Sequence, residues 1–215
     1  MLKVTSRIII TSATIASALG SSLAQAETVI DPLTSSSSYK EAYAMLEARD
    51  FGGAIRKFDE LIKESDKSPG IYYGRAKAKQ ELGDNKGALV DYTKSIELDR
   101  TNAKAFSNRA LIKGAMGDMK AALSDLNQAI ALQPNYAHAF SNRGVTRGAL
   151  GDLRGALADF SKAISINSRY ETALRNRGIT RELTGDIKGA CEDWRRAASL
   201  GQNDAVKWVQ AQCRE

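Results

Sequence analysis

The sequence predicts an all-α solenoid in which short helix pairs stack one on the next. A Gly-Asp dipeptide recurs every 34 residues, and small and apolar residues recur with it at helical spacing. A repeat of this length indicates structural units that each contact only their neighbours in the chain. We therefore expect five antiparallel helix pairs followed by one capping helix. The Gly-Asp dipeptides begin at Gly83, Gly117, Gly151 and Gly185.

Residues 1–26 have the pattern of a secretory signal peptide. Lys3 and Arg7 precede an uncharged apolar stretch, which ends in the small-residue cleavage site Ala24-Gln25-Ala26. The apolar stretch is short for a membrane anchor, which is one alternative, and a transit peptide is the other. We expect export to the periplasm or the outside medium, with the thylakoid lumen as the alternative, and no stable membrane insertion after cleavage. Residues 27–37 should then form a flexible, serine-rich leader.

The composition is that of a folded chain and narrows the possible chemistry. The formal net charge of +6 falls to +4 when Lys3 and Arg7 leave with the signal, which is mild for a nucleic-acid binder. Two cysteines and one histidine cannot form a cysteine scaffold or a cysteine-only zinc site. His138 also lacks the partners that a general base needs. We expect no metal, no cofactor and no enzymatic activity.

Residues 38–215 form the predicted repeat domain. In each unit the glycine should end the first helix in the left-handed conformation, and the aspartate should cap the second helix. Arg49-Asp50 occupies the same place in the first unit. Small residues recur where the two helices must approach closely, at Ala42, Ala76, Ala110, Gly144 and Gly178. The five units are 35–68, 69–102, 103–136, 137–170 and 171–204.

These patterns resemble the tetratricopeptide repeat family. An early bulky residue recurs at Tyr72, Phe106, Phe140 and Leu174, and a late small residue recurs at Ser95, Ala129, Ala163 and Ala197. The resemblance implies a right-handed superhelix with a concave groove lined by the first helices. Basic residues replace the family's tyrosine, and the Asn-Arg-Gly or Asn-Arg-Ala motifs resemble an exported bacterial subtype.

Opposite charges repeat together with the fold. An arginine precedes each small residue of the first helix, and an aspartate follows 16 residues later. In the first unit Glu41 and Lys57 occupy these two places, so the charges are swapped and the opposite sign is kept. We predict structural salt bridges between the paired helices, with anion binding by the arginines as the alternative. The predicted pairs are Arg75–Asp91, Arg109–Asp125, Arg143–Asp159 and Arg177–Asp193.

Two rows of polar side chains are the candidate binding residues. The family resemblance places Asn108, Asn142 and Asn176 on the groove, where amides can bond to an extended peptide backbone. We predict a non-enzymatic interaction scaffold of the cell envelope, which binds a peptide segment or a partner helix. Local hydrogen bonding of the asparagines is the alternative for the row itself. The rival function is binding of an anionic polymer by the basic row Lys79, Lys113, Arg147 and Arg181.

The C-terminal residues predict a cap for the last helix pair. Residues 203–214 read as an amphipathic helix, which we expect to be N-capped by Asn203 or Asp204. Cys191 and Cys213 lie at similar distances on either side of the turn at Leu200-Gly201. In an antiparallel helix pair the two cysteines face each other, so export predicts a Cys191–Cys213 disulfide.

Overall fold

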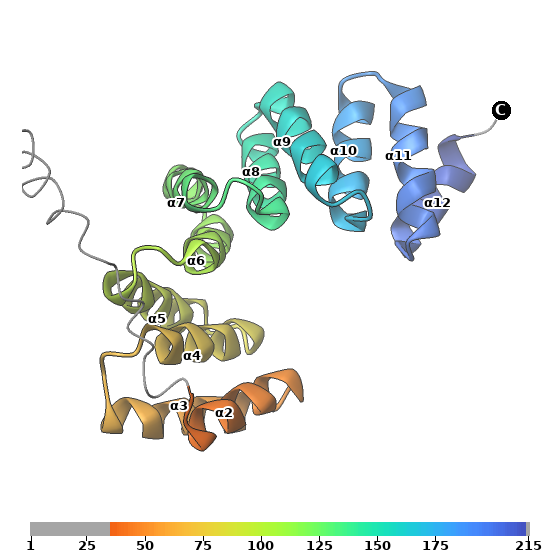
Figure 1. The fold of residues 1–215 in the computed structure, drawn as a ribbon. Coiled ribbons are helices and arrows are strands. Elements are labelled where there is room, and N and C mark those ends of the chain that lie inside the picture. The colour runs from red at the N-terminus through yellow and green to blue at the C-terminus, as the bar shows by residue number, and fades with distance from the viewer. Residues whose placement is uncertain (1–34, 214–215) are drawn as a thin grey trace, which may run out of the picture. The chain divides into compact units, whose positions relative to one another are not determined.

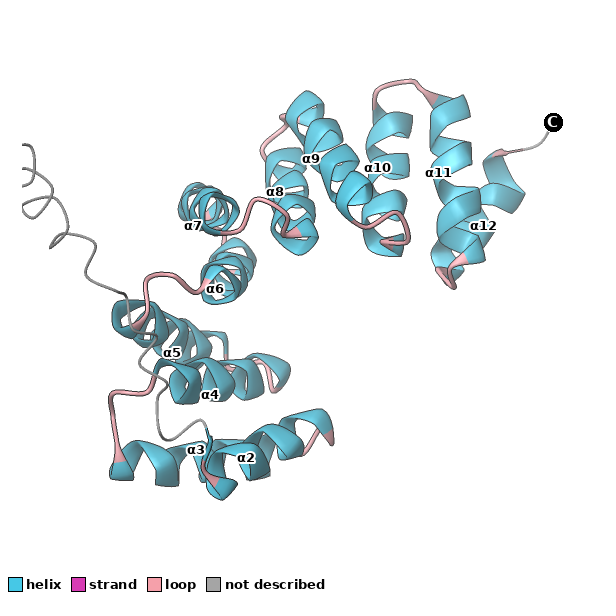
Figure 2. Ribbon diagram, viewed as in Figure 1, coloured by secondary structure: helices cyan, strands magenta, loops and turns pink. Residues whose placement is uncertain are grey.

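The computed structural model describes residues 35–213, and these form helices joined by short turns, with no strand among them (Figures 1 and 2). The predicted signal peptide and most of the predicted leader lie outside the described residues. None of the helices in this range is long and apolar enough to cross a bilayer. The helices are α2 Ser37–Glu47, α3 Phe51–Glu64, α4 Pro69–Glu81, α5 Asn85–Leu98, α6 Ala103–Ala115, α7 Met119–Leu132, α8 Ala137–Ala149, α9 Leu153–Ile166, α10 Glu171–Leu183, α11 Ile187–Ser199 and α12 Asn203–Gln212.

Consecutive helices form five pairs, α2–α3 to α10–α11, and α12 packs against α11 (Figure 1). The second helix of each pair also contacts the first helix of the next pair. First helices of successive pairs contact each other directly at α2–α4, α6–α8 and α8–α10. This arrangement confirms the predicted helix-pair solenoid, and it brings the first helices together on one face.

The turns inside the pairs follow from the Gly-Asp dipeptides. Gly83, Gly117, Gly151 and Gly185 have φ between 80° and 90°, a conformation that a Cβ atom disfavours. Arg49 takes the left-handed conformation in the first pair, with φ of 63°. The next residue, always aspartate, accepts a hydrogen bond from the backbone N–H three residues later and so caps the second helix.

Small residues of the first helices give room to large residues of the second helices. A Cβ atom on Gly144 would lie 2.8 Å from Cε1 of Phe160, and a Cβ on Gly178 would overlap the indole of Trp194. Where the facing residue is Tyr92 or Leu126, alanine takes the place of glycine and is buried. The core is therefore a row of small-to-large contacts along the helix pairs.

The C-terminal helix covers the last pair. Trp208 of α12 lies 5.3 Å from Trp194 of α11, measured between ring centroids. The sulfur atoms of Cys191 and Cys213 lie 2.02 Å apart, as a disulfide bond requires. The predicted cap residue of α12 is wrong by one position. Gln202 is the N-cap, its side chain makes no capping bond, and Asn203 is already the first helical residue.

Candidate functional site on the first-helix face

Four buried aspartates of the second helices each accept two parallel hydrogen bonds from an arginine of the first helix. Asp91, which is 1% exposed, accepts bonds of 2.8 Å from Nε and 2.6 Å from Nη2 of Arg75. The same two-bond contact recurs in the next three pairs, with distances of 2.7 to 2.9 Å. Two parallel charge-assisted bonds fix the orientation of both side chains. The partners are the four Arg–Asp pairs that the 16-residue spacing predicts.

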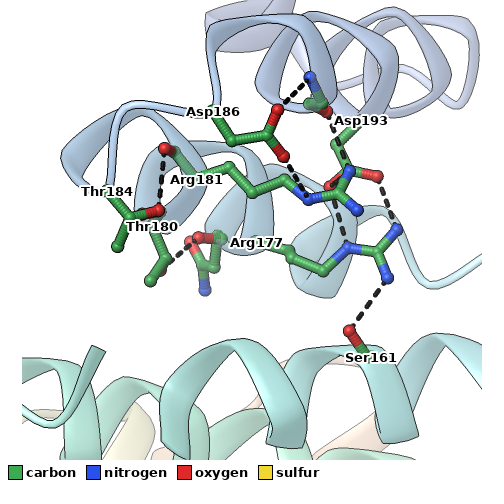
Figure 3. A network of polar contacts seen from close by, with 9 residues as sticks. Ser161, Arg177, Thr180, Arg181, Thr184, Asp186 and Asp193 are labelled. Atoms are coloured by element: carbon green, nitrogen blue, oxygen red, sulfur yellow. Dashed lines mark hydrogen bonds and ion pairs between the residues drawn. The ribbon is translucent and has the colours of Figure 1, made fainter. Parts of the chain in front are cut away.

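The predicted basic row contacts the same aspartates. Lys79 lies 2.7 Å from Asp91, and Arg181 lies 2.8 Å from Asp193. Lys113 with Asp125 and Arg147 with Asp159 repeat this contact at 2.8 Å. Figure 3 shows Arg177 and Arg181 both directed at Asp193, and Arg181 also reaches Asp186. These four cations are therefore partners of buried carboxylates and do not stand free on the surface.

Each arginine also reaches back to the second helix of the preceding pair. Nη1 of Arg177 donates to Oγ of Ser161 at 3.1 Å, as Figure 3 shows, and Nη1 of Arg75 lies 2.6 Å from Oδ1 of Asp59. Thr93 and Asn127 accept from Arg109 and Arg143 in the same way. One arginine thus joins three helices across a repeat boundary, a contact that we did not predict. The available signal was the polar residue that recurs at Asp59, Thr93, Asn127 and Ser161.

The first pair keeps the contact with the charges exchanged. Nζ of Lys57 in α3 lies 3.0 Å from Oε2 of Glu41 in α2. The hydrogen bond with Glu41 raises the pKa of Lys57. The side chain of Glu41 is 52% exposed, whereas the aspartates of the later pairs are buried. This pair lacks the second cation and the buried carboxylate that characterise the other four.

The three asparagines lie half-buried on neighbouring first helices, and each makes a local hydrogen bond. Nδ2 of Asn108 donates to the hydroxyl of Tyr73 in α4, and Nδ2 of Asn142 donates to Oγ of Ser107 in α6, both at 3.2 Å. Oδ1 of Asn176 accepts from Nη1 of Arg175 at 3.1 Å. Within residues 35–213, no donor is bonded to Oδ1 of Asn108 or Asn142, and no acceptor is bonded to Nδ2 of Asn176. The row therefore retains both donors and acceptors.

Aromatic hydroxyls extend this polar row. Burial raises the pKa of Tyr73 to about 12, although the hydrogen bond with Asn108 works in the opposite direction. Burial also raises the pKa of Tyr136 and Tyr170, which bond to Ser107 and Ser141. These tyrosines therefore stay protonated at neutral pH and act as neutral hydrogen-bonding groups.

An apolar hollow of about 200 Å³ lies beside the asparagine row. Its walls come from α8, α9 and α10, and they include Val145, Gly148, Ile179 and Leu183. Asn176 and Thr180 are the two polar residues among its walls. A second hollow of about 340 Å³ lies at the other end of the chain, between α2, α3 and α4, and is charged, with Glu47, Arg49, Lys77 and Glu81 among its walls.

His138 lies between two tyrosine rings at the start of α8. Its ring centroid is 5.7 Å from that of Tyr136 and 4.9 Å from that of Tyr170. No group of three or more histidines, cysteines, aspartates or glutamates that could hold a metal ion occurs in the part of the chain that the structure describes. The surroundings of His138 are those of an aromatic contact.

Two of the helix pairs match a known repeat family by sequence. Residues 69–102 and 103–136, which contain α4 to α7, match the tetratricopeptide repeat model. The two matched units, 69–102 and 103–136, are two of the five that the spacing of the motifs predicts. No curated protein matches the sequence significantly.

Three solved structures share the fold of this chain. MamA from Desulfovibrio magneticus RS-1 is 20% identical, with a TM-score of 0.67 over 77% of this chain and 95% of that one. YrrB, a tetratricopeptide-repeat protein with an unusual peptide-binding site, is 19% identical, with a TM-score of 0.62 over 79% and 88%. PilF from Pseudomonas aeruginosa is 16% identical, with a TM-score of 0.73 over 81% and 82%. At these identities the likeness establishes the fold.

Proposed function

We propose that this tetratricopeptide-repeat chain is a non-enzymatic scaffold that binds an extended peptide segment of another exported protein along its first helices. The observation that carries the proposal is the asparagine row, whose members lie one repeat apart on helices that contact each other. An extended backbone offers alternating N–H and C=O groups. The free Oδ1 atoms of Asn108 and Asn142 can accept from the N–H groups, and Nδ2 of Asn176 can donate to a C=O.

The rest of the repeat supports this role by holding the row in place. Each asparagine directly precedes an arginine that is fixed to three helices, so little side-chain or backbone freedom remains to be lost on binding. The helix-pair fold is generally an interaction module, and YrrB shows that a structure of this kind can carry a peptide site. Fold alone does not set the partner, so the proposal depends on the row.

The cell envelope is the setting that we propose. The sequence pattern of residues 1–26 predicts export, and the sulfur atoms of Cys191 and Cys213 lie at bonding distance. Disulfides persist mainly in oxidising compartments outside the cytosol. We infer that the partner is exported as well.

The test is affinity capture from an envelope extract with the wild type and an Asn108→Ala/Asn142→Ala/Asn176→Ala variant. The proposal expects a partner that the wild type retains and the variant loses. A Tyr73→Phe/Ser107→Ala variant is the matched control, because it removes the internal hydrogen bonds of Asn108 and Asn142 and leaves all three asparagines in place. The control should retain the partner.

Two other outcomes would count against the asparagine row. A partner that both the wild type and the triple variant retain would place the site elsewhere. Binding that falls steeply with salt, shows no peptide preference and ignores the asparagines would indicate the rival function, an anionic polymer held by the basic row. The ion pairs of Lys79, Lys113, Arg147 and Arg181 with buried aspartates give that rival little support.

A further inference from the structure

We propose that the Cys191–Cys213 disulfide is a redox latch, which a dithiol reductant opens and which then releases α12 from α11. The disulfide joins the residue that follows α12 to α11, across a sequence separation of 22 residues. The release also changes the hydrogen bonding of Asn176, and this consequence alone rests on the proposed function. The covalent step and the release involve no partner protein.

Apart from the disulfide, α12 is held weakly. Of its ten described residues only Ala205 is buried, whereas α10, the preceding first helix, buries four of its 13 residues. A helix of ten residues is marginal in water by itself, so it depends on packing or on a covalent link. Arg175 pairs with Asp204, and Arg195 donates to the backbone O of Cys213, but both contacts are exposed and so stabilise little. Loss of the disulfide should therefore free the helix.

The disulfide is within reach of a reductant. It borders a surface hollow of about 280 Å³, and Cys213 is partly exposed whereas Cys191 is 6% exposed. An incoming thiolate therefore reaches the sulfur of Cys213 more easily than that of Cys191. The other walls of the hollow are Ile187, Lys188, Arg195 and Gln212.

The charge of the hollow favours the exchange reaction. Lys188 precedes Cys191 by three residues and Arg195 follows it by four, a spacing that places all three on one face of α11. No acidic residue of the described range 35–213 is among the walls. The two positive charges attract an incoming thiolate and stabilise the thiolate that leaves from Cys191.

The reaction is an ordinary thiol–disulfide exchange with a dithiol. One thiolate of the dithiol attacks Sγ of Cys213, a new S–S bond forms there, and Cys191 leaves as a thiolate that takes a proton from solvent. The second thiolate of the dithiol then attacks the dithiol's own sulfur in the mixed disulfide and releases Cys213, which is also protonated. The dithiol loses two electrons and two protons and becomes a disulfide, and the two cysteines are reduced to thiols.

Arg175 links the latch to the asparagine row. Its Nη2 lies 3.4 Å from Oδ2 of Asp204, and its Cζ lies 5.3 Å from the ring centroid of Trp208, both residues of α12. Nη1 of the same side chain donates to Oδ1 of Asn176 at 3.1 Å. Release of α12 removes the two contacts that orient Arg175, so we expect Oδ1 of Asn176 to lose its donor. Asn176 would then offer a free acceptor, as the other two asparagines of the row do.

The test adds dithiothreitol, a small dithiol, to the oxidised full chain without denaturant. Thiol counting should find two free thiols. The backbone amides of α12 should then lose their protection from hydrogen exchange, while those of α4 to α7 retain it. Trp208 is one of two tryptophans in the chain, so its exposure should shift the fluorescence emission to longer wavelength.

Three variants sharpen this test. A Cys191→Ser/Cys213→Ser variant should lack protection in α12 without any reductant, and dithiothreitol should not change it. A Lys188→Gln variant should be reduced about threefold more slowly at low salt, because a positive charge beside the sulfur atoms is lost. Lys207→Gln is the matched control, since Lys207 is exposed on α12 and is not among the walls of the hollow. This control should be reduced at the wild-type rate.

The link to the asparagine row has its own measurement. In NMR spectra the side-chain amide resonances of Asn176 should move on reduction, because Oδ1 loses the bond from Arg175. Those of Asn108 and Asn142, which bond to residues of α4 and α6, should stay in place.

The outcomes separate the latch from the proposed function. Two free thiols with unchanged protection in α12 would overturn the latch, and so would a disulfide that dithiothreitol reduces only in urea. Release of α12 without a change at Asn176 would overturn the link to the row. The scaffold proposal is decided separately, by capture with the asparagine variant.

Discussion

The two ends of the repeat array share one backbone plan and the same aspartate caps, and they differ in the ion pairs between the two helices of a pair. At the N-terminal end, α2 and α3 are joined by one exposed Glu41–Lys57 pair, and the hollow beside them is lined by charges. Towards the C-terminal end, each second helix buries an aspartate under two cations, and the hollow is apolar. The small-to-large core is common to both ends. The repeat period therefore specifies the fold, whereas the surface of the first helices varies from repeat to repeat and can specify a partner.

The largest effect should come from removing one buried carboxylate. We expect Asp125→Ala to lower the free energy of unfolding by about 3–5 kcal/mol, because it leaves Arg109 and Lys113 close together without their counter-charge. Glu41→Ala at the other end should cost no more than about 1 kcal/mol, since Glu41 is exposed. Urea denaturation of both variants measures the difference. Equal stability of the two variants would show that the buried ion pairs do not stabilise the array.

The next effect concerns the covalent link at the C-terminal end. Replacing Cys191 and Cys213 by serine should lower the free energy of unfolding by about 3 kcal/mol, because the reduced chain has more freedom when unfolded. Hydrogen exchange should rise mainly in α11 and α12, and little in α2 and α3, which lie at the far end. Thiol counting on the protein from its native source checks the premise. Two free thiols would contradict the disulfide.

A smaller loss should follow from crowding the core where glycine faces a large ring. Gly178→Ala places a Cβ against the indole of Trp194 and should cost about 1–3 kcal/mol. The equivalent residue in α4 is already alanine and faces the buried Tyr92 without strain, so this cost belongs to the C-terminal repeats. Thermal unfolding of the single variant measures it. An unchanged melting temperature would mean that the tryptophan can move aside freely.

The smallest effect has the opposite sign. Gly148→Ala should raise the free energy of unfolding by about 0.5–1 kcal/mol, because alanine favours the helix and meets only Ala156 at 3.9 Å. Gly114→Ala should raise it by a similar amount. A loss of stability at position 148 alone would show that the glycine serves packing. Urea denaturation curves of the two alanine variants measure the comparison.

The sequence predicts the fold well because the fold repeats. The 34-residue period fixes the helix pairs, and the Gly-Asp dipeptides fix their turns. The exchange of charge between Glu41 and Lys57 also indicates which positions face each other, and the structure places these two side chains together. In each case several repeats carry the same residue at the same position. The one repeat that departs from this pattern, with Glu41 and Lys57, therefore shows which two positions face each other.

The candidate site was less predictable because it depends on groups that meet across repeats. The bond from Arg177 to Ser161 joins residues of two different units, and a reading of one unit at a time does not reveal it. The sequence does not show that the basic row has partners, but in the structure its members bind the same aspartates as the arginines of the four Arg–Asp pairs. The apolar hollow is harder still to predict, since its walls come from three helices of two repeats. Its walls become visible only when α8 and α10 are placed side by side.

The arginine that bonds to three helices sets a rule for changing the length of this protein. Each such arginine draws one acceptor from the pair before it, so a repeat is complete only in the presence of its predecessor. A designer who inserts a consensus repeat into the array would have to place a polar acceptor at the position of Asp59, Thr93, Asn127 and Ser161. In an inserted repeat without that acceptor, the arginine of the following repeat would lose its hydrogen bond to the preceding pair. Local unfolding would then begin at that junction.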